Sequence, residues 1–120
     1  MSRRQPEGRI KDHCRTDHAD PNGLIFWQIE GKSRNGIPDT LASRCAGGAV
    51  LIEFKKPGER PTEQQYLRIH ELRAEGIEAW WTDSVEGYRK IVGLDPGGYK
   101  VEYPEKILRL IALATKADDL

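Results

Sequence analysis

The stretch Ala49–Lys56 reads Ala-Val-Leu-Ile-Glu-Phe-Lys-Lys. Its branched and aromatic residues predict a β-strand. Successive residues of a strand point to opposite faces, so Val50, Ile52 and Phe54 occupy one face here, while Leu51, Glu53 and Lys55 occupy the other. Both faces begin apolar. We therefore expect a central strand that is covered on both faces and opens only at its end onto a polar site.

Glu53 and Lys55 stand side by side at the polar end of this strand. Removing either charge from water costs several kcal/mol unless a partner or a metal ion compensates. A second carboxylate, Asp39, follows Pro38, whose ring fixes the local backbone on the segment that leads into the neighbouring strand. Two acids and a lysine in this arrangement are what hydrolysis of a phosphodiester by bound Mg²⁺ requires.

These three residues also have a simpler interpretation. Glu53 and Lys55 could form an exposed ion pair at the strand end, which would contribute little to stability. Asp39 would then be a residue that favours the turn. The two interpretations differ in whether the side chains are buried.

The remaining pattern predicts an α/β fold with a mixed sheet flanked by helices. The chain of 120 residues is expected to form a single domain over positions 1–120. Apolar periodicity and turn residues predict these elements in chain order: a helix over Glu7–Cys14, strands over Leu24–Ile29 and Thr40–Cys45, a turn at Ala46–Gly48, the strand Ala49–Lys56, a helix over Thr62–Gly76, a strand over Ile77–Thr82, and helices over Ser84–Val92 and Pro104–Ala117.

Three short motifs occur in a fixed order: Gly36-Ile37-Pro38-Asp39, then Ile52-Glu53-Phe54-Lys55, then Thr62-x-x-Gln65 ahead of Leu72 and Gly76. In these motifs the chain resembles the VRR-NUC branch of the PD-(D/E)xK nuclease superfamily, over positions 30–90. An isolated Glu-x-Lys is weak evidence for this family, but the three motifs in this order and at these spacings are fairly specific to it. The resemblance implies a restriction-endonuclease-like fold and a DNA nuclease that uses Mg²⁺, with Mn²⁺ as a substitute.

The resemblance also implies roles for particular residues. Asp39, Glu53 and the backbone carbonyl of Phe54 would bind the metal, and Lys55 would orient or deprotonate the attacking water. Gln65 matches a glutamine that helps to hold the family's site. It is explained equally well as the third residue of a capping box, and the two roles are compatible.

Glu7 matches the acid that the family carries on its first helix. Asp12, Asp17 and Glu30 are other candidates for that position. An acid near a helix N-terminus is also favoured by the helix dipole alone, so Glu7 needs no catalytic role to be explained.

The charges balance at 19 basic and 19 acidic residues, so no global field attracts nucleic acid. Basic residues nevertheless flank the candidate site, with Lys32 and Arg34 before Asp39 and with Lys56 and Arg60 after Glu53. We interpret these four as DNA-binding residues. Each of them could instead be a solvated charge paired with a nearby acid.

Small stand-alone members of the family resemble phage products that cut branched DNA, such as four-way junctions, as homodimers. The wide apolar stripe of the last helix favours a homodimer as well. The alternatives are a catalytically silent nucleic-acid-binding protein of the same fold and an unrelated α/β interaction domain.

Two distant cysteines, Cys14 and Cys45, favour a reducing, cytoplasmic setting, and no apolar run is long enough to predict a membrane span. The histidines at positions 13 and 18 have the wrong spacing for a zinc site on one helical face.

Overall fold

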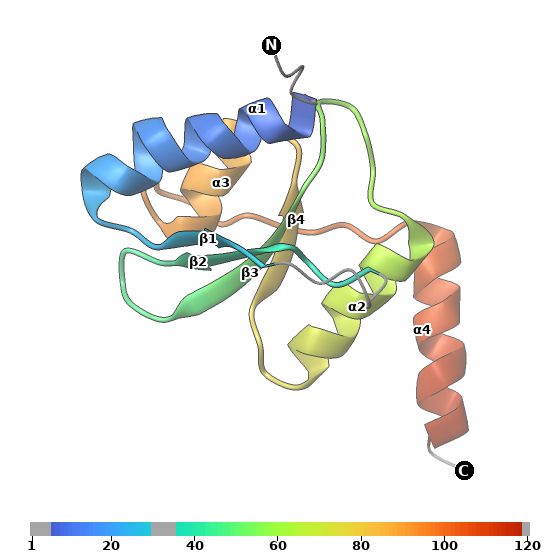
Figure 1. Cartoon of the computed structure of the whole chain (residues 1–120). Helices are drawn as coiled ribbons and strands as arrows, with labels where there is room; N and C mark the ends of the chain where they lie inside the picture. The colour runs from blue at the N-terminus through green and yellow to red at the C-terminus, as the bar shows by residue number, and fades with distance from the viewer. Residues whose placement is uncertain (1–5, 30–35, 119–120) are drawn as a thin grey trace.

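The computed structural model describes the backbone of residues 6–29 and 36–118 and the side chains of residues 9–29 and 36–114. Four strands form one sheet in the order β1–β2–β3–β4. β1 pairs with β2, and β2 with β3, in antiparallel fashion, whereas β3 and β4 are parallel. The predicted mixed sheet is confirmed (Figure 1). The strands are β1 (Phe26–Gln28), β2 (Thr40–Ser43), β3 (Ala49–Phe54) and β4 (Ala79–Thr82).

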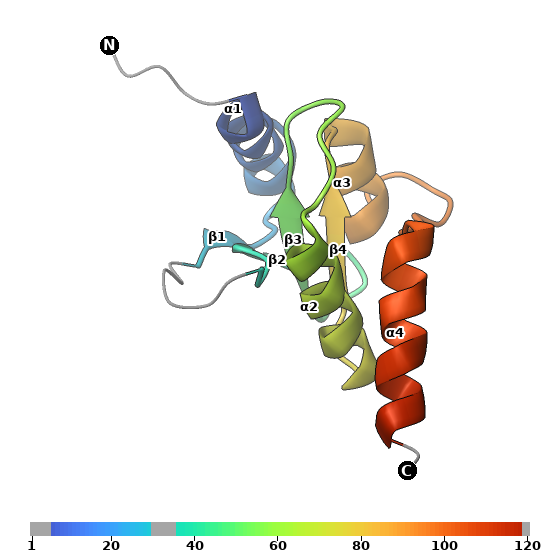
Figure 2. The same cartoon turned by 90° about the vertical axis from the view of Figure 1, so that its right-hand side faces the viewer.

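Helices cover both faces of the sheet, which gives three layers. α1 (Pro6–His13) and α3 (Val85–Val92) lie on one face, where a core forms around Ile52, Phe54 and Tyr88. α2 (Glu63–Ala74) and α4 (Glu105–Asp118) lie on the other, where Ile69, Trp81 and Ile107 form a second core. Figure 2 shows α2 in front of β3 and β4, with α4 beside it.

β3 is a central strand, as its two-sided apolar pattern predicts. It pairs with β2 along one edge and with β4 along the other. Val50 and Ile52 are buried on the α1 side, and Leu51 packs against the second core. The end of β3 that carries Glu53 is therefore held in place by neighbours on all sides.

The first helical segment is longer than the sequence predicts. α1 continues without a break as a π-helix, η1 (Cys14–Ala19), and then as a 3₁₀ turn, η2 (Asp20–Asn22), before Gly23 ends it with φ 67°. Cys14 and Ala19 are both fully buried against the sheet. Their burial keeps the chain helical past the point where the local sequence pattern ends.

The apolar stripe of α4 is only partly covered. Ile107 is buried in the second core, and Leu110 and Ile111 pack against it. Leu108 and Leu113 face solvent.

In the part of the chain that the structure describes, no helix has the length and apolar character needed to cross a membrane.

Candidate active site

Asp39 and Glu53 come together because of the β2–β3 register. Thr40 pairs with Ile52 in the antiparallel ladder. One step further along the same ladder places Asp39 opposite Glu53, and directly opposed residues have Cβ atoms about 4.5–5.5 Å apart. The pairing of β1 with β2 also extends to Asp39, because the Asp39 carbonyl accepts a hydrogen bond from the Ile29 N–H over 2.6 Å. The two predicted carboxylates therefore lie at one end of the sheet, Asp39 just before β2 and Glu53 on the neighbouring strand β3.

Gly36 fixes where the segment before Asp39 lies. It adopts φ 83°, a left-handed conformation that glycine favours. A Cβ at this position would lie 2.8 Å from the backbone carbon and oxygen of Gln64 in α2. The Gly-Ile-Pro-Asp motif can therefore pack directly against α2, which holds Asp39 at the sheet end that carries Glu53.

Glu53 is a buried carboxylate, with only 8% of its surface exposed. Burial, followed by the nearby charge of Asp39, raises its pKa from the ordinary 4.5 to about 7. The charges of Lys55 and Lys11 oppose this shift, while Glu59 adds to it. Among the described residues, no hydrogen bond or ion pair to Glu53 is found. The charges of Lys55 and Lys11 therefore compensate this buried carboxylate only in part.

Asp39 has two polar partners. The Lys11 Nζ lies 2.6 Å from its Oδ2, and the Thr40 hydroxyl donates to its Oδ1 over 3.2 Å. Lys11 comes from α1 and is mostly shielded from solvent. The sequence analysis did not assign Lys11 to the site, because the two residues are 28 positions apart and no motif links them.

Lys55 follows directly after β3 and remains aligned with the sheet, since its N–H donates to the Thr82 carbonyl over 2.9 Å. Only 12% of its side chain is exposed. Its Nζ lies 3.7 Å from Glu59, and no contact at ion-pair distance joins it to Glu53 in the described part of the chain. The interpretation of Glu53 and Lys55 as an exposed ion pair is therefore wrong. Glu59 is a second residue that the sequence analysis missed.

Gln65 forms the predicted capping box of α2. Its Oε1 accepts the Thr62 N–H over 2.8 Å, and its own N–H donates to the Thr62 hydroxyl over 3.2 Å. The structural role of Gln65 is thus confirmed.

Five other predicted residues have different outcomes. Glu7 lies in α1, but its side chain is outside the described residues, as are Lys32 and Arg34 altogether. Lys56 is 50% exposed and lies 3.6 Å from Glu59. Arg60 places its guanidinium 5.5 Å from the ring centre of Trp81.

Arg60 also contributes to a cavity of about 280 Å³, which Tyr66, Glu102, Tyr103 and Pro104 complete. Trp81 is the β4 partner of Glu53 in the parallel ladder. Arg60 is therefore on the same side of the sheet as Glu53 and contacts the neighbouring strand.

The donor set suits a hard divalent cation. The Lys55 N–H points to β4. The carbonyl of Phe54 belongs to the same trans peptide and points the opposite way, toward the β2 side. It lies beyond the Thr40–Ile52 pair, on the side where Asp39 lies. Two carboxylates and a carbonyl are oxygen ligands that Mg²⁺ prefers. No cluster of three or more His, Cys, Asp or Glu side chains suited to a metal ion occurs among the residues described. A metal here would thus rely on the two carboxylates, the carbonyl, water and substrate.

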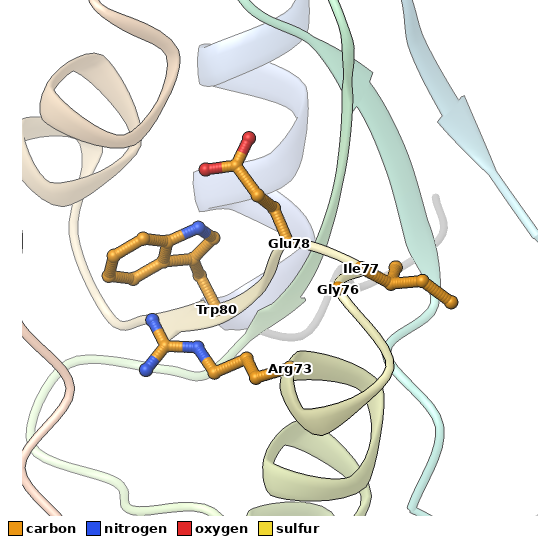
Figure 3. A pocket seen from close by; sticks show the side chains of 5 residues that line it. All are labelled: Arg73, Gly76, Ile77, Glu78 and Trp80. Carbon is orange, nitrogen blue, oxygen red and sulfur yellow. The ribbon is translucent and has the colours of Figure 1, made fainter.

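Another cavity, of about 170 Å³, lies at the beginning of β4 and has a different character. Figure 3 shows the extended Arg73 side chain beside the Trp80 ring, with the guanidinium 4.1 Å from the ring centre. The Arg73 Nε donates to the Ala79 carbonyl, and Glu78 pairs with Arg44. The only acid that lines this cavity, Glu78, is neutralised by Arg44, while the buried Trp80 indole N–H has no hydrogen-bond partner among the described residues. It lacks the paired carboxylates of the Asp39–Glu53 site.

The mixed sheet flanked by helices is the restriction-endonuclease-like α/β fold that the sequence predicts. The structure matches a solved structure described as a VRR_NUC domain with a TM-score of 0.63 and 20% identity, covering 75% of this chain and 97% of the other. The particular fold is therefore that of the VRR-NUC domains, and the predicted resemblance is confirmed at this level.

A sequence comparison finds a relative of this chain independently of the fold. The chain is 40% identical over 48 residues to the "Putative nuclease p44" of Acyrthosiphon pisum secondary endosymbiont phage 1. This match spans 40% of the chain and half the length of the phage protein. No protein-family model matches the chain.

Proposed function

We propose that the protein is a Mg²⁺-dependent DNA nuclease that hydrolyses phosphodiester bonds, with Mn²⁺ as a substitute. The observation that carries the proposal is the convergence of Asp39, buried Glu53 and shielded Lys55 at one end of the sheet. A fold shared with VRR-NUC domains and the likeness to a phage protein named as a nuclease support it.

Each residue has a role that its surroundings support. Asp39, Glu53 and the Phe54 carbonyl would hold the metal ion, which when bound supplies a Lewis acid and a source of hydroxide near neutral pH. Lys55 would orient the attacking water or accept its proton, and would offset charge that builds up on the phosphate. Its low exposure keeps this charge in a poorly solvated site, where electrostatic interactions are stronger.

Four basic residues that flank the site in the sequence would contact DNA. Lys56 and Arg60 follow β3 on the chain, and Lys32 and Arg34 precede Asp39 in sequence. Phosphate contacts of this kind would position the strand without reading its sequence. Gln65 would support the site by holding the first turn of α2, against which Gly36 packs, and Glu7 would add a carboxylate from α1.

By the same resemblance we propose branched DNA, such as four-way junctions, as the substrate and a homodimer as the active form. Resolving a four-way junction needs two cuts, which a two-fold dimer supplies. The exposed Leu108 and Leu113 of α4 offer apolar surface for such an interface. Light scattering at high micromolar concentration should return the mass of a dimer; a monomer mass would rule out the dimer.

The function is tested with labelled single-stranded, duplex, flap and four-way DNA in Mg²⁺, Mn²⁺ or EDTA. Cleavage with either metal and none in EDTA is the expected result, with the four-way substrate cut fastest. Binding of DNA without cleavage under any condition would instead identify a catalytically silent member of the fold. If the protein neither binds nor cleaves any of these DNAs, the chain has the VRR-NUC fold without a nuclease or DNA-binding function.

A further inference from the structure

The edge strand β1 carries large apolar side chains that face solvent. Phe26 is half-buried and packs against Phe54 at a ring-centre distance of 5.6 Å, whereas Trp27 is 60% exposed. Ile25 and Ile29, two positions to either side, are exposed as well. Alternate residues of an extended chain share a face, so Ile25, Trp27 and Ile29 form one exposed stripe, the β1 stripe.

The β1 stripe lies on the face of the sheet that carries the candidate site. Trp27 pairs with Leu41, and Leu41 pairs with Leu51 of β3. Directly paired residues point to the same face, and Leu51 and Glu53 alternate with the buried Ile52. Trp27 and Glu53 therefore belong to one continuous face, which α2 covers over β3 and β4.

The stripe is also close to the site. The Ile29 N–H donates to the Asp39 carbonyl over 2.6 Å, so Ile29 lies directly beside Asp39. Trp27, two residues before Ile29, is then a diagonal neighbour of Asp39, and such neighbours are roughly 7–8 Å apart. This separation is comparable to one nucleotide step. A phosphodiester held at Asp39 would bring an adjoining nucleotide to the Trp27 side chain.

The chemistry of the stripe indicates which part of a nucleotide it would contact. Its side chains carry no charge, so a phosphate gains nothing from them, whereas the flat face of an indole stacks well on a nucleobase. Bases in a duplex hide their faces inside the stack and show only their edges. Away from a duplex end, only an unpaired base can present its face to Trp27.

We propose that the β1 stripe binds an unpaired base next to the phosphodiester to be cut, with Trp27 as the stacking platform. The proposal rests on the nuclease function above and specifies its substrate as DNA with single-stranded nucleotides beside a duplex. Gaps, flaps and opened branch points share this feature.

The test measures binding without metal, so that no DNA is cut. Fluorescence anisotropy in EDTA compares a labelled flush-ended duplex with the same duplex interrupted by a short single-stranded gap. Wild-type protein should bind the gapped DNA more tightly. Trp27→Ala should weaken binding to the gapped DNA by about tenfold or more and leave the flush duplex unaffected.

Two variants serve as controls. Trp27→Phe should keep most of the preference for gapped DNA, because an aromatic face remains. Ile77→Ala removes another exposed apolar side chain, just before β4 and 45% exposed, and should behave as wild type. Both positions are on the surface, so none of these substitutions should impair folding.

The proposal is overturned if wild type shows no preference for the gapped DNA or if Trp27→Ala retains it. It is also overturned if light scattering shows that Trp27→Ala splits a wild-type dimer, since the stripe would then be an interface between copies. Cleavage by wild type in Mg²⁺, measured in parallel, separates a failure of this inference from a failure of the nuclease function. Cleavage with no effect at Trp27 defeats this inference alone, whereas a wild type that neither cuts nor binds defeats the nuclease function too.

Discussion

The Lys11 ammonium lies 2.6 Å from a carboxylate oxygen of Asp39, across 28 positions of sequence. This contact gives Asp39 a counter-ion from α1. Glu53, which is more buried, has no ion-pair partner within the described residues. The two carboxylates of the candidate site are thus compensated unequally, and each should respond differently to substitution.

Lys11→Met should increase the affinity for Mg²⁺. The substitution frees an Asp39 oxygen and removes a positive charge beside the place of the metal ion, and both effects favour a cation. We expect an affinity gain of about tenfold and lower stability without metal, because Asp39 loses its counter-ion. Isothermal titration with Mg²⁺ checks the first effect and thermal melting in EDTA the second. Lys106→Met, which removes an exposed ion pair with Glu63, is the control. Unchanged Mg²⁺ affinity would show that Lys11 does not compete with the metal.

Glu53→Gln should stabilise the metal-free protein at neutral and alkaline pH. The folded-state pKa of Glu53 is raised to about 7, so the native protein holds this proton more tightly than the unfolded chain. Wild-type stability therefore falls as pH rises from about 4.5 to 7 and stays reduced above, by on the order of 3 kcal/mol in total. The glutamine has no charge to bury and avoids this loss.

Melting curves in EDTA check the effect. At pH 8 the midpoint of Glu53→Gln should exceed that of wild type by on the order of 10 °C, and at pH 4 the two should agree. Glu75→Gln changes an exposed acid at the end of α2 and should follow wild type at both values. A difference of equal size at pH 4 and pH 8 would contradict the assignment to Glu53 ionisation.

The sheet and its polar end could be predicted from local pattern. Alternation along β3 fixes which residues face each layer, so the buried position of Ile52 and the shared face of Leu51 and Glu53 follow from period two alone. The capping box at Thr62 and Gln65 is equally local. Such features depend on residues a few positions apart, and the sequence contains all of that information.

The partners of the charged groups could not be predicted in the same way. Lys11 meets Asp39 only because α1 packs on a particular part of the sheet, and its extension through η1 depends on burial of Cys14 and Ala19. Glu59 is near Lys55 in sequence, yet no motif marks it as the residue that contacts both Lys55 and Lys56. Tertiary packing decides these pairs.

Gly36→Ala should destabilise the protein and reduce cleavage. Gly58→Ala is a matched control, because both glycines have φ near 84° but only Gly36 would bring its new Cβ against the backbone of Gln64. We expect Gly58→Ala to cost about 1–2 kcal/mol from backbone strain. Gly36→Ala should add about 1–3 kcal/mol of steric conflict. Urea unfolding measures both.

Cleavage separates the two glycine variants further. Relief of the clash at Gly36 would move the segment that carries Asp39 away from α2, and a shift of about 1 Å in a catalytic group can cost a hundredfold in rate. Gly58→Ala should cleave at a rate close to that of wild type. Equal stability and equal cleavage in the two variants would mean that the approach of Gly36 to α2 does not position the site.

Lys55→Ala should abolish cleavage while Lys56→Ala does not. The two lysines are adjacent and both lie near Glu59, but Lys55 is 12% exposed and Lys56 is 50% exposed. Loss of a shielded charge that stabilises the reacting phosphate typically costs on the order of a hundredfold or more in rate. Loss of an exposed pair, worth under about 1 kcal/mol, should change the rate by only a few-fold.

Metal binding distinguishes the roles of the three site residues. Asp39→Ala and Glu53→Ala should lose both cleavage and Mg²⁺ binding, because each removes a ligand. Lys55 is not a ligand, so Lys55→Ala should bind Mg²⁺ at least as well as wild type and still fail to cut DNA. Titration calorimetry and single-turnover cleavage in saturating Mg²⁺ measure the two properties on the same preparation. If Lys55→Ala retains more than a few tenths of wild-type cleavage, the lysine is structural and the assignment of this motif as a nuclease site is wrong.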